Sequence, residues 1–117
     1  MAVEIVNFTI NQGETWSEEV IPVALHNYSG YTGRCQIRAT AEATSPVIAS
    51  PLVEITGEGQ RFSLSLTAAE TLALPVGGTT VSSTTVYLYD VFLTSADTLT
   101  TTKSAQGTIT VIPAVTR

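Results

Sequence analysis

The sequence predicts an all-β protein, an immunoglobulin-like antiparallel β-sandwich of about eight strands with one short helix over Thr67–Leu74. Three observations predict this fold. Apolar and polar residues alternate with a period of two, turn signals recur at spacings of roughly 8–12 residues, and helical spacing occurs once. A small barrel is the other architecture that this pattern allows. The 117 residues suit a single domain over residues 1–117.

The first two strands precede residue 26. Val3–Ile10 alternates, with Val6, Phe8 and Ile10 on one side. After a turn at Asn11–Gly13, a second strand is expected over about Thr15 to Leu25. Its inward residues are expected to be Ile21, Val23 and Leu25. Pro22 has no backbone donor, so this strand is predicted to be an edge strand or to bulge there.

The middle of the chain contains the clearest alternation. In Thr32–Ala41 one face carries Cys35, Ile37 and Ala39, and the other carries Arg34, Gln36 and Arg38. A short strand over Leu52–Ile55 and a strand over Arg61–Leu66 flank Gly57–Gly59. Glycine accepts the positive φ of a tight turn, so this segment predicts a hairpin. The inward residues of the second strand are predicted to be Phe62, Leu64 and Leu66.

The helix signal follows directly. Thr67-Ala68-Ala69-Glu70 is a capping box, which begins a helix, and Pro75 ends it. Val86–Leu93 is apolar on both faces and is expected to be a central strand. Two more strands are predicted over Thr98–Lys103 and Gly107–Ile112, and Pro113 ends the pairing.

The shared alternation phase predicts a core made by residues from most of these strands. It includes Phe8, Ile37, Phe62, Leu64, Tyr89, Val91 and Ile109. The single cysteine, Cys35, cannot form an internal disulfide. It is interpreted as a small buried apolar residue, and a reactive thiol is the alternative.

Composition argues against several classes of partner. The net charge is −5, and five basic residues are too few for a stripe that binds nucleic acid. No apolar run approaches the roughly 20 residues that span a bilayer, and the start of the chain lacks the pattern of a signal peptide. We therefore expect neither nucleic acid nor membrane as a partner, and synthesis in a cytoplasm without processing.

The sequence offers little catalytic chemistry. The single histidine, His26, lies in a predicted loop, and no nucleophile elbow supports a triad assembled from it, Asp90 and a serine. With one histidine and one cysteine, a zinc site has too few ligands. The sequence therefore predicts a protein that is not an enzyme and uses no metal or other cofactor.

Two kinds of binding residue stand out instead. Trp16, Tyr28 and Tyr31 lie in or beside predicted loops, where their rings could stack on a sugar. The other interpretation is that Trp16 and Tyr31 are core or rim residues. Serine and threonine crowd Thr79–Thr85, and such uncharged surface costs little to bury against a neighbour. The candidate partner contacts are Thr79, Thr80, Thr84, Thr85, Pro113 and Arg117.

Five segments resemble motifs of a group of small phage virion proteins. They are GETW at Gly13–Trp16, SGYTGRCQIR at Ser29–Arg38, LSLTAAETLAL at Leu64–Leu74, YDVFL at Tyr89–Leu93 and GTITVIPAVTR at Gly107–Arg117. Their order and spacing agree over most of the chain. The group is similar to the immunoglobulin-like N-terminal domain of phage upper baseplate proteins.

The resemblance implies a non-catalytic structural component of a phage virion, made in the host cytoplasm and assembled in several copies with other virion proteins. A tail, baseplate or fibre-adaptor module is the expected role. A capsid decoration (cement) protein is the first alternative. A carbohydrate-binding module is an alternative of a different class.

Overall fold

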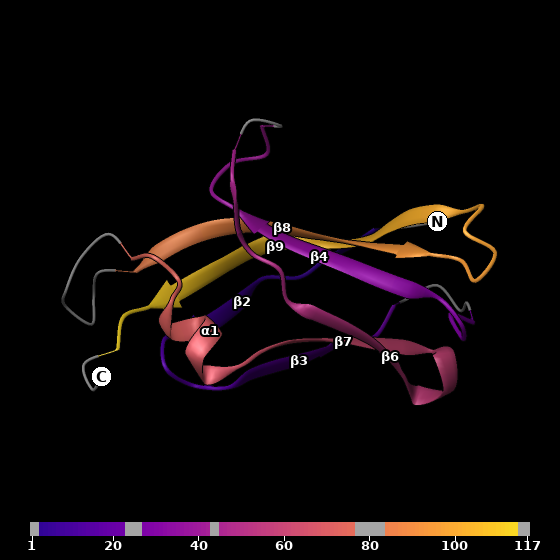
Figure 1. The fold of residues 1–117 in the computed structure, drawn as a ribbon, viewed down its shortest axis with the longest axis horizontal. Coiled ribbons are helices and arrows are strands. Elements are labelled where there is room, and N and C mark those ends of the chain that lie inside the picture. Colours follow the sequence, from indigo (N-terminus) through magenta and orange to yellow (C-terminus); the bar gives the residue numbers. More distant parts are fainter. Residues whose placement is uncertain (1–2, 23–26, 43–44, 77–83, 115–117) are drawn as a thin grey trace.

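The chain folds as two β-sheets packed face to face. The computed structural model describes residues 3–22, 27–42, 45–76 and 84–114. The larger sheet contains β1 (Glu4–Ile5), β2 (Phe8–Asn11), β4 (Thr32–Arg38), β5 (Val47–Ala49), β8 (Thr85–Thr94) and β9 (Thr101–Ile112). The smaller sheet contains β3 (Trp16–Val20), β6 (Leu52–Thr56) and β7 (Arg61–Leu66). Figure 1 shows the larger sheet above the smaller one.

The strand order is that of an immunoglobulin-like sandwich, as predicted. In that fold three strands, C, F and G, share one sheet, and B, E and D share the other. Here β4, β8 and β9 pair in the first sheet, and β3, β7 and β6 pair in the second. Tyr87, near the start of β8, also donates a hydrogen bond back to the carbonyl of Pro75 at 2.6 Å. This contact resembles the tyrosine corner of immunoglobulin domains.

One departure from prediction concerns strand direction. Both β1 and β2 pair with β9 in parallel, with Phe8 opposite Ile109, so the larger sheet is mixed rather than wholly antiparallel. The first strands lie along the outer edge of the last strand and run towards the same end of the sandwich (Figure 1). A period of two specifies a strand but not the direction of its partner.

The end of the chain corrects a second prediction. Thr98–Lys103 and Gly107–Ile112 were expected to be separate strands, but β9 is continuous over Thr101–Ile112. The pairing with β8 shifts register between Val91 and Phe92, and the adjacent residues Ser104 and Ala105 are both buried. A bulge of this kind reverses the alternation phase within one strand, so the sequence pattern resembles two strands.

The second strand is shorter than predicted. β3 ends at Val20, which is buried together with Trp16, whereas Ile21 is 64% exposed. The inward assignment of Ile21 is therefore wrong, and Val23 and Leu25 lie outside the described residues. Pro22 cannot continue the ladder, and β3 lies at an edge of its sheet, as predicted. Similarly, Ala39 is exposed because β4 ends at Arg38.

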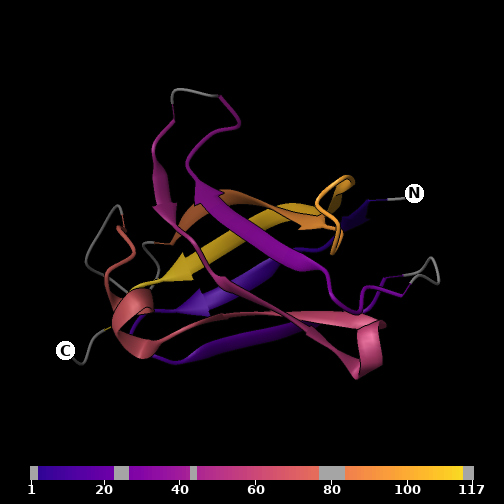
Figure 2. The ribbon, with the colours of Figure 1, turned by 45° about the vertical axis from the view of Figure 1, so that its right-hand side comes forward.

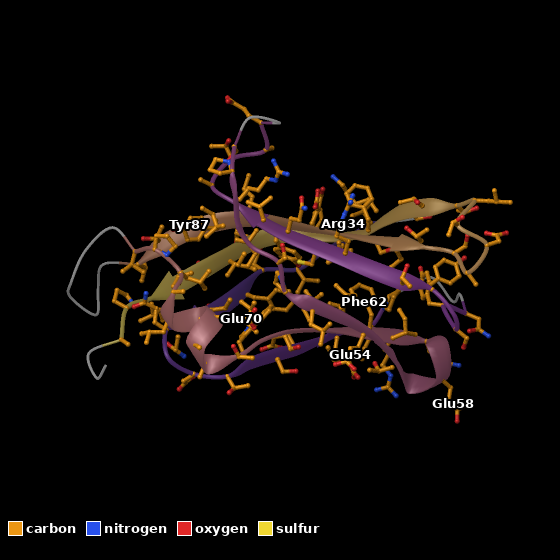
Figure 3. All side chains as sticks on the ribbon, in the orientation of Figure 1. Arg34, Glu54, Glu58, Phe62, Glu70 and Tyr87 are labelled. Carbon is orange, nitrogen blue, oxygen red and sulfur yellow. The ribbon has the colours of Figure 1, made fainter. Side chains whose placement is uncertain are left out.

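The core lies between the two sheets and matches the predicted set. All seven predicted members are buried: Phe8, Ile37, Phe62, Leu64, Tyr89, Val91 and Ile109. Phe8 of the larger sheet meets Trp16 of the smaller sheet edge to face, with ring centroids 5.5 Å apart. Figure 3 shows Phe62 between the layers. Aromatic packing therefore joins the two sheets.

The predicted helix closes one end of the sandwich. Helix α1 spans Ala68–Leu72, so it is shorter than the predicted Thr67–Leu74, and Thr67 and Glu70 form the predicted capping box. The buried hydroxyl of Thr71 donates to the carbonyl of Glu14 at 2.8 Å, which fixes α1 against the turn before β3. At the other end, the 3₁₀ turn η1 (Gly57–Gly59) connects β6 to β7 (Figure 2). The predicted hairpin is therefore confirmed.

Candidate functional site

The outer face of the larger sheet presents an ordered array of side chains. Alternate residues of β4, β8 and β9 point away from the core, and the strand register aligns them in rows across the sheet. From one end to the other the rows are Arg34–Phe92–Lys103, Gln36–Asp90–Gln106 and Arg38–Leu88–Thr108. Polar, charged and apolar groups therefore share one continuous surface.

This face is hollowed, and we call the hollow the outer groove. It has a volume of about 650 Å³, and all three rows of side chains line it. One side of the groove is bordered by Thr40–Glu42, which lead away from the sheet in Figure 2. Ile5 of β1 borders the other side. A second hollow of about 290 Å³ shares Arg34 and Phe92 with it and continues along β4 to Thr32.

The cations of the groove differ in how they are held. Arg38 donates hydrogen bonds to the carbonyl of Ser45 at 2.7 Å and to the side chain of Gln36 at 3.0 Å. Lys103 lies 3.7 Å from the Asp90 carboxylate. Arg34 is exposed, and it makes no hydrogen bond or ion pair with any residue that the structure describes. Its guanidinium therefore has all its donors available to a ligand.

Apolar side chains contribute to the same surface. Leu88 is 37% exposed in the middle of β8, and the ring of Phe92 is half-buried beside Lys103, whose Nζ lies 5.7 Å from the ring centroid. Ile5, Val47 and Val86 are also exposed on strands of this sheet. Val86–Leu93 is thus central, as predicted, but its outer side is open rather than covered. An exposed apolar surface with charged groups around it is typical of an interaction site.

The structure describes three of the six predicted partner contacts. Thr84 is exposed, and Thr85 is half-buried as the first residue of β8. Pro113 is buried, which removes its side chain from a contact surface. Thr79, Thr80 and Arg117 lie outside the described residues. None of the described contacts lines the outer groove.

The rings that were candidates for sugar stacking are not open platforms. Trp16 is 6% exposed and Tyr28 is 1% exposed, so both belong to the core. Tyr31 is half-buried, and its ring packs edge to face against Tyr28 at 5.2 Å between centroids. This arrangement agrees with the interpretation of Trp16 and Tyr31 as core or rim residues.

Few groups in the described part of the chain could support catalysis. Burial, together with the nearby Asp90 carboxylate, raises the pKa of the Cys35 thiol to about 12. No cluster of three or more histidine, cysteine, aspartate or glutamate side chains suited to a metal ion occurs among the described residues, and His26 lies outside them. The described helix is too short to cross a membrane.

Sequence reasoning assigned Arg34, Gln36 and Arg38 to one outward face but did not identify it as a site. The available signal was the unusual gathering of cations on one strand of an acidic chain. The apolar half of the groove comes from β8, more than fifty residues later in the chain. No local pattern indicates that these two strands are neighbours.

Comparison with known proteins finds solved structures of low sequence identity. No protein-family model and no curated protein matches the sequence. A Bacteroides vulgatus protein described as a candidate glycoside hydrolase has a TM-score of 0.49 and 11% identity over 92% of this chain, which spans 17% of that protein. The extracellular domain of the voltage-gated sodium channel β4 subunit has a TM-score of 0.41 and 10% identity, covering 98% of this chain and 97% of that one.

Proposed function

We propose that this chain is a non-catalytic structural component of a bacteriophage particle, and that it acts as an adaptor module in the tail or baseplate. The observation that carries the proposal is the outer groove, an open face of mixed apolar and cationic character on a compact immunoglobulin-like sandwich. Such a face suits a protein partner, because apolar area supplies binding energy and fixed charges select the partner. The motif resemblance to small virion proteins supports the same class.

Particle composition tests the proposal. Particles of the phage that encodes the chain are purified by density gradient, and the copy number is measured by mass spectrometry with labelled standard peptides. We expect a fixed number of copies per particle that survives high-salt washing. Absence from purified particles, or a copy number that varies between preparations, would overturn the proposal.

Imaging of the same particles decides between locations. Single-particle reconstruction should place the copies at the tail or baseplate, with the symmetry of that assembly. Density distributed over the capsid lattice would instead identify a decoration protein and refute the adaptor role. Binding of the isolated protein to a glycan array, with no incorporation into particles, would favour the carbohydrate-binding alternative.

A further inference from the structure

Charge is unevenly distributed over the two outer faces of the sandwich. Three of the five basic residues, Arg34, Arg38 and Lys103, line the outer groove with two carboxylates, Asp90 and Glu42. This surface therefore carries a small positive charge in a chain whose net charge is −5. Figure 3 shows Arg34 directed away from the smaller sheet, whereas Glu54 and Glu58 lie on the opposite side of the molecule.

The pairing within the groove leaves one cation dominant. Lys103 faces Asp90, which balances its charge, and Arg38 is oriented by its bonds to Ser45 and Gln36. Arg34 borders both hollows of the face and has no described partner. Arginine pairs with carboxylates through two parallel hydrogen bonds, so it favours an acidic ligand over a neutral one.

The shape of the groove indicates an extended ligand. Arg34 and Arg38 lie on the same side of β4, about 13 Å apart along the strand at the usual rise per residue. Leu88 and Phe92 lie opposite them on β8. Thr40–Glu42 stands above the sheet on one side, so a narrow segment fits the groove better than a flat protein face does.

We propose that the outer groove binds an extended, acidic segment of a partner protein, whose carboxylates contact Arg34 and Arg38 and whose apolar side chains pack on Leu88 and Phe92. This inference rests on the proposed function and identifies the chemistry of the partner in the particle. A second copy of this chain is a poorer occupant. Its acidic groups Glu19 and Glu54 lie on the face of a three-stranded sheet, and a sheet face fits the groove less well than an extended segment does. Nucleic acid is disfavoured by the Asp90 and Glu42 carboxylates.

A designed peptide tests the chemistry directly. In an extended chain alternate residues point to one side, so Glu-Ser-Leu-Ser-Glu-Ser-Leu-Ser presents glutamate and leucine on a single face. The probe is this peptide with a fluorescent label. The control peptide carries the same label and has lysine in place of each glutamate. Fluorescence anisotropy should show saturable binding of the acidic peptide to the full chain and no binding of the lysine peptide. Addition of the acidic peptide should shift the NMR signals of backbone amides in β4 and β8.

Matched variants locate the contact. Arg34→Gln and Arg61→Gln each remove one positive charge, but Arg61 lies on the smaller sheet and pairs with Glu19 at 3.0 Å. Loss of a charge-assisted hydrogen bond should weaken binding of the acidic peptide to Arg34→Gln by about tenfold or more. Arg61→Gln should bind it as the wild type does. Circular dichroism should show that both variants fold, because Arg34 makes no described bond and the ion pair of Arg61 with Glu19 is exposed to solvent.

Each other outcome counts against the groove proposal. No binding of the acidic peptide, equal binding of the lysine peptide, or equal weakening by both substitutions would overturn it. Sedimentation that shows a concentration-dependent dimer of the wild type, lost in Arg34→Gln, would assign the groove to a second copy instead. Particle occupancy separates the two proposals. Absence of the wild type from particles contradicts the proposed function alone. If the Arg34→Gln variant reaches full occupancy in particles and binds the acidic peptide as the wild type does, only the groove proposal is contradicted.

Discussion

Single buried polar residues connect distant segments of this sandwich. Gln12, 6% exposed, donates a hydrogen bond to the carbonyl of Leu74 at 2.7 Å, and its side-chain oxygen accepts one from the amide of Ala114 at 3.0 Å. One side chain therefore joins the turn after β2, the end of the helical segment and the chain after β9. The sequence placed Gln12 in a turn but gave no sign that it is buried, because its partners are more than sixty residues away.

Cys35 provides a test of burial at the scale of one atom. It is 1% exposed and its pKa is raised to about 12, so at pH 8 roughly one thiol in ten thousand is the reactive thiolate. We expect the native protein not to react with Ellman's reagent within an hour, and to react at once in concentrated urea. Gln36→Cys, which places a thiol on the outward side of β4, is the positive control and should react in the folded state. Rapid labelling of the native wild type would show that the thiol is accessible.

Gly107 makes a close approach that no other residue type allows. A Cβ atom there would lie 2.1 Å from the carbonyl oxygen of Val6, the residue between β1 and β2. The same oxygen accepts the hydroxyl hydrogen bond of Tyr89 at 2.7 Å. Gly107→Ala should therefore displace the first strands and lower the free energy of unfolding by about 1–3 kcal/mol. Urea denaturation measures this, with Thr108→Ala as the control next to it. A Gly107→Ala protein as stable as the wild type would contradict the close approach of Val6, between β1 and β2, to β9.

Among the elements, α1 is the one whose beginning the sequence specifies fully. The Thr67 hydroxyl accepts a hydrogen bond from the amide of Glu70 at 3.2 Å, and the Glu70 carboxylate accepts one from the amide of Thr67 at 2.9 Å. Thr67→Ala should destabilise the protein by about 1 kcal/mol, and Thr67→Ser, which keeps the hydroxyl, by much less. Thermal unfolding compares the two variants. Equal losses for alanine and serine would mean that the cap contributes nothing.

The contrast between α1 and β9 shows what local sequence can and cannot predict. A capping box acts within four residues, so the helix was predicted in the correct place, although it ends at Leu72 rather than at Leu74. The bulge in β9 depends on its pairing with β8, and the parallel direction of β1 and β2 depends on the route of the chain between the two sheets. These features are set by contacts far apart in the sequence. The core was predictable because burial requires only the correct phase within each strand.

At the scale of the molecule, contacts between residues far apart in the sequence explain why the sequence predicted only part of the candidate site. The outward position of Arg34, Gln36 and Arg38 follows from alternation within one strand. The groove additionally needs the apolar residues of β8 beside them and the wall formed by Thr40–Glu42. A site made by several strands becomes visible only when the sheet order is known. The burial of Trp16 and Tyr28 likewise depends on contacts between the sheets, since both residues lie close to turns yet belong to the core.

The two sheets share one core, so the molecule should unfold as a single cooperative unit. Trp16, the only tryptophan, belongs to the smaller sheet and packs against Phe8 of the larger one, so its fluorescence reports the contact between the sheets. Far-ultraviolet circular dichroism reports mostly the strands of the larger sheet, because they include most of the paired residues. We expect the two signals to give coincident urea transitions.

Phe62→Ala tests this cooperativity from within the core. Phe62 is fully buried on β7, in the centre of the smaller sheet, and its truncation should lower the free energy of unfolding by about 3–5 kcal/mol. If the sheets depend on each other, the loss appears equally in the fluorescence and the circular dichroism transitions, although the residue belongs to only one sheet. Ser63→Ala, a change on the outward side of the same strand, should shift neither transition appreciably. A fluorescence transition that moves to lower urea while the circular dichroism transition stays in place would show that the smaller sheet unfolds separately, and would refute the single core.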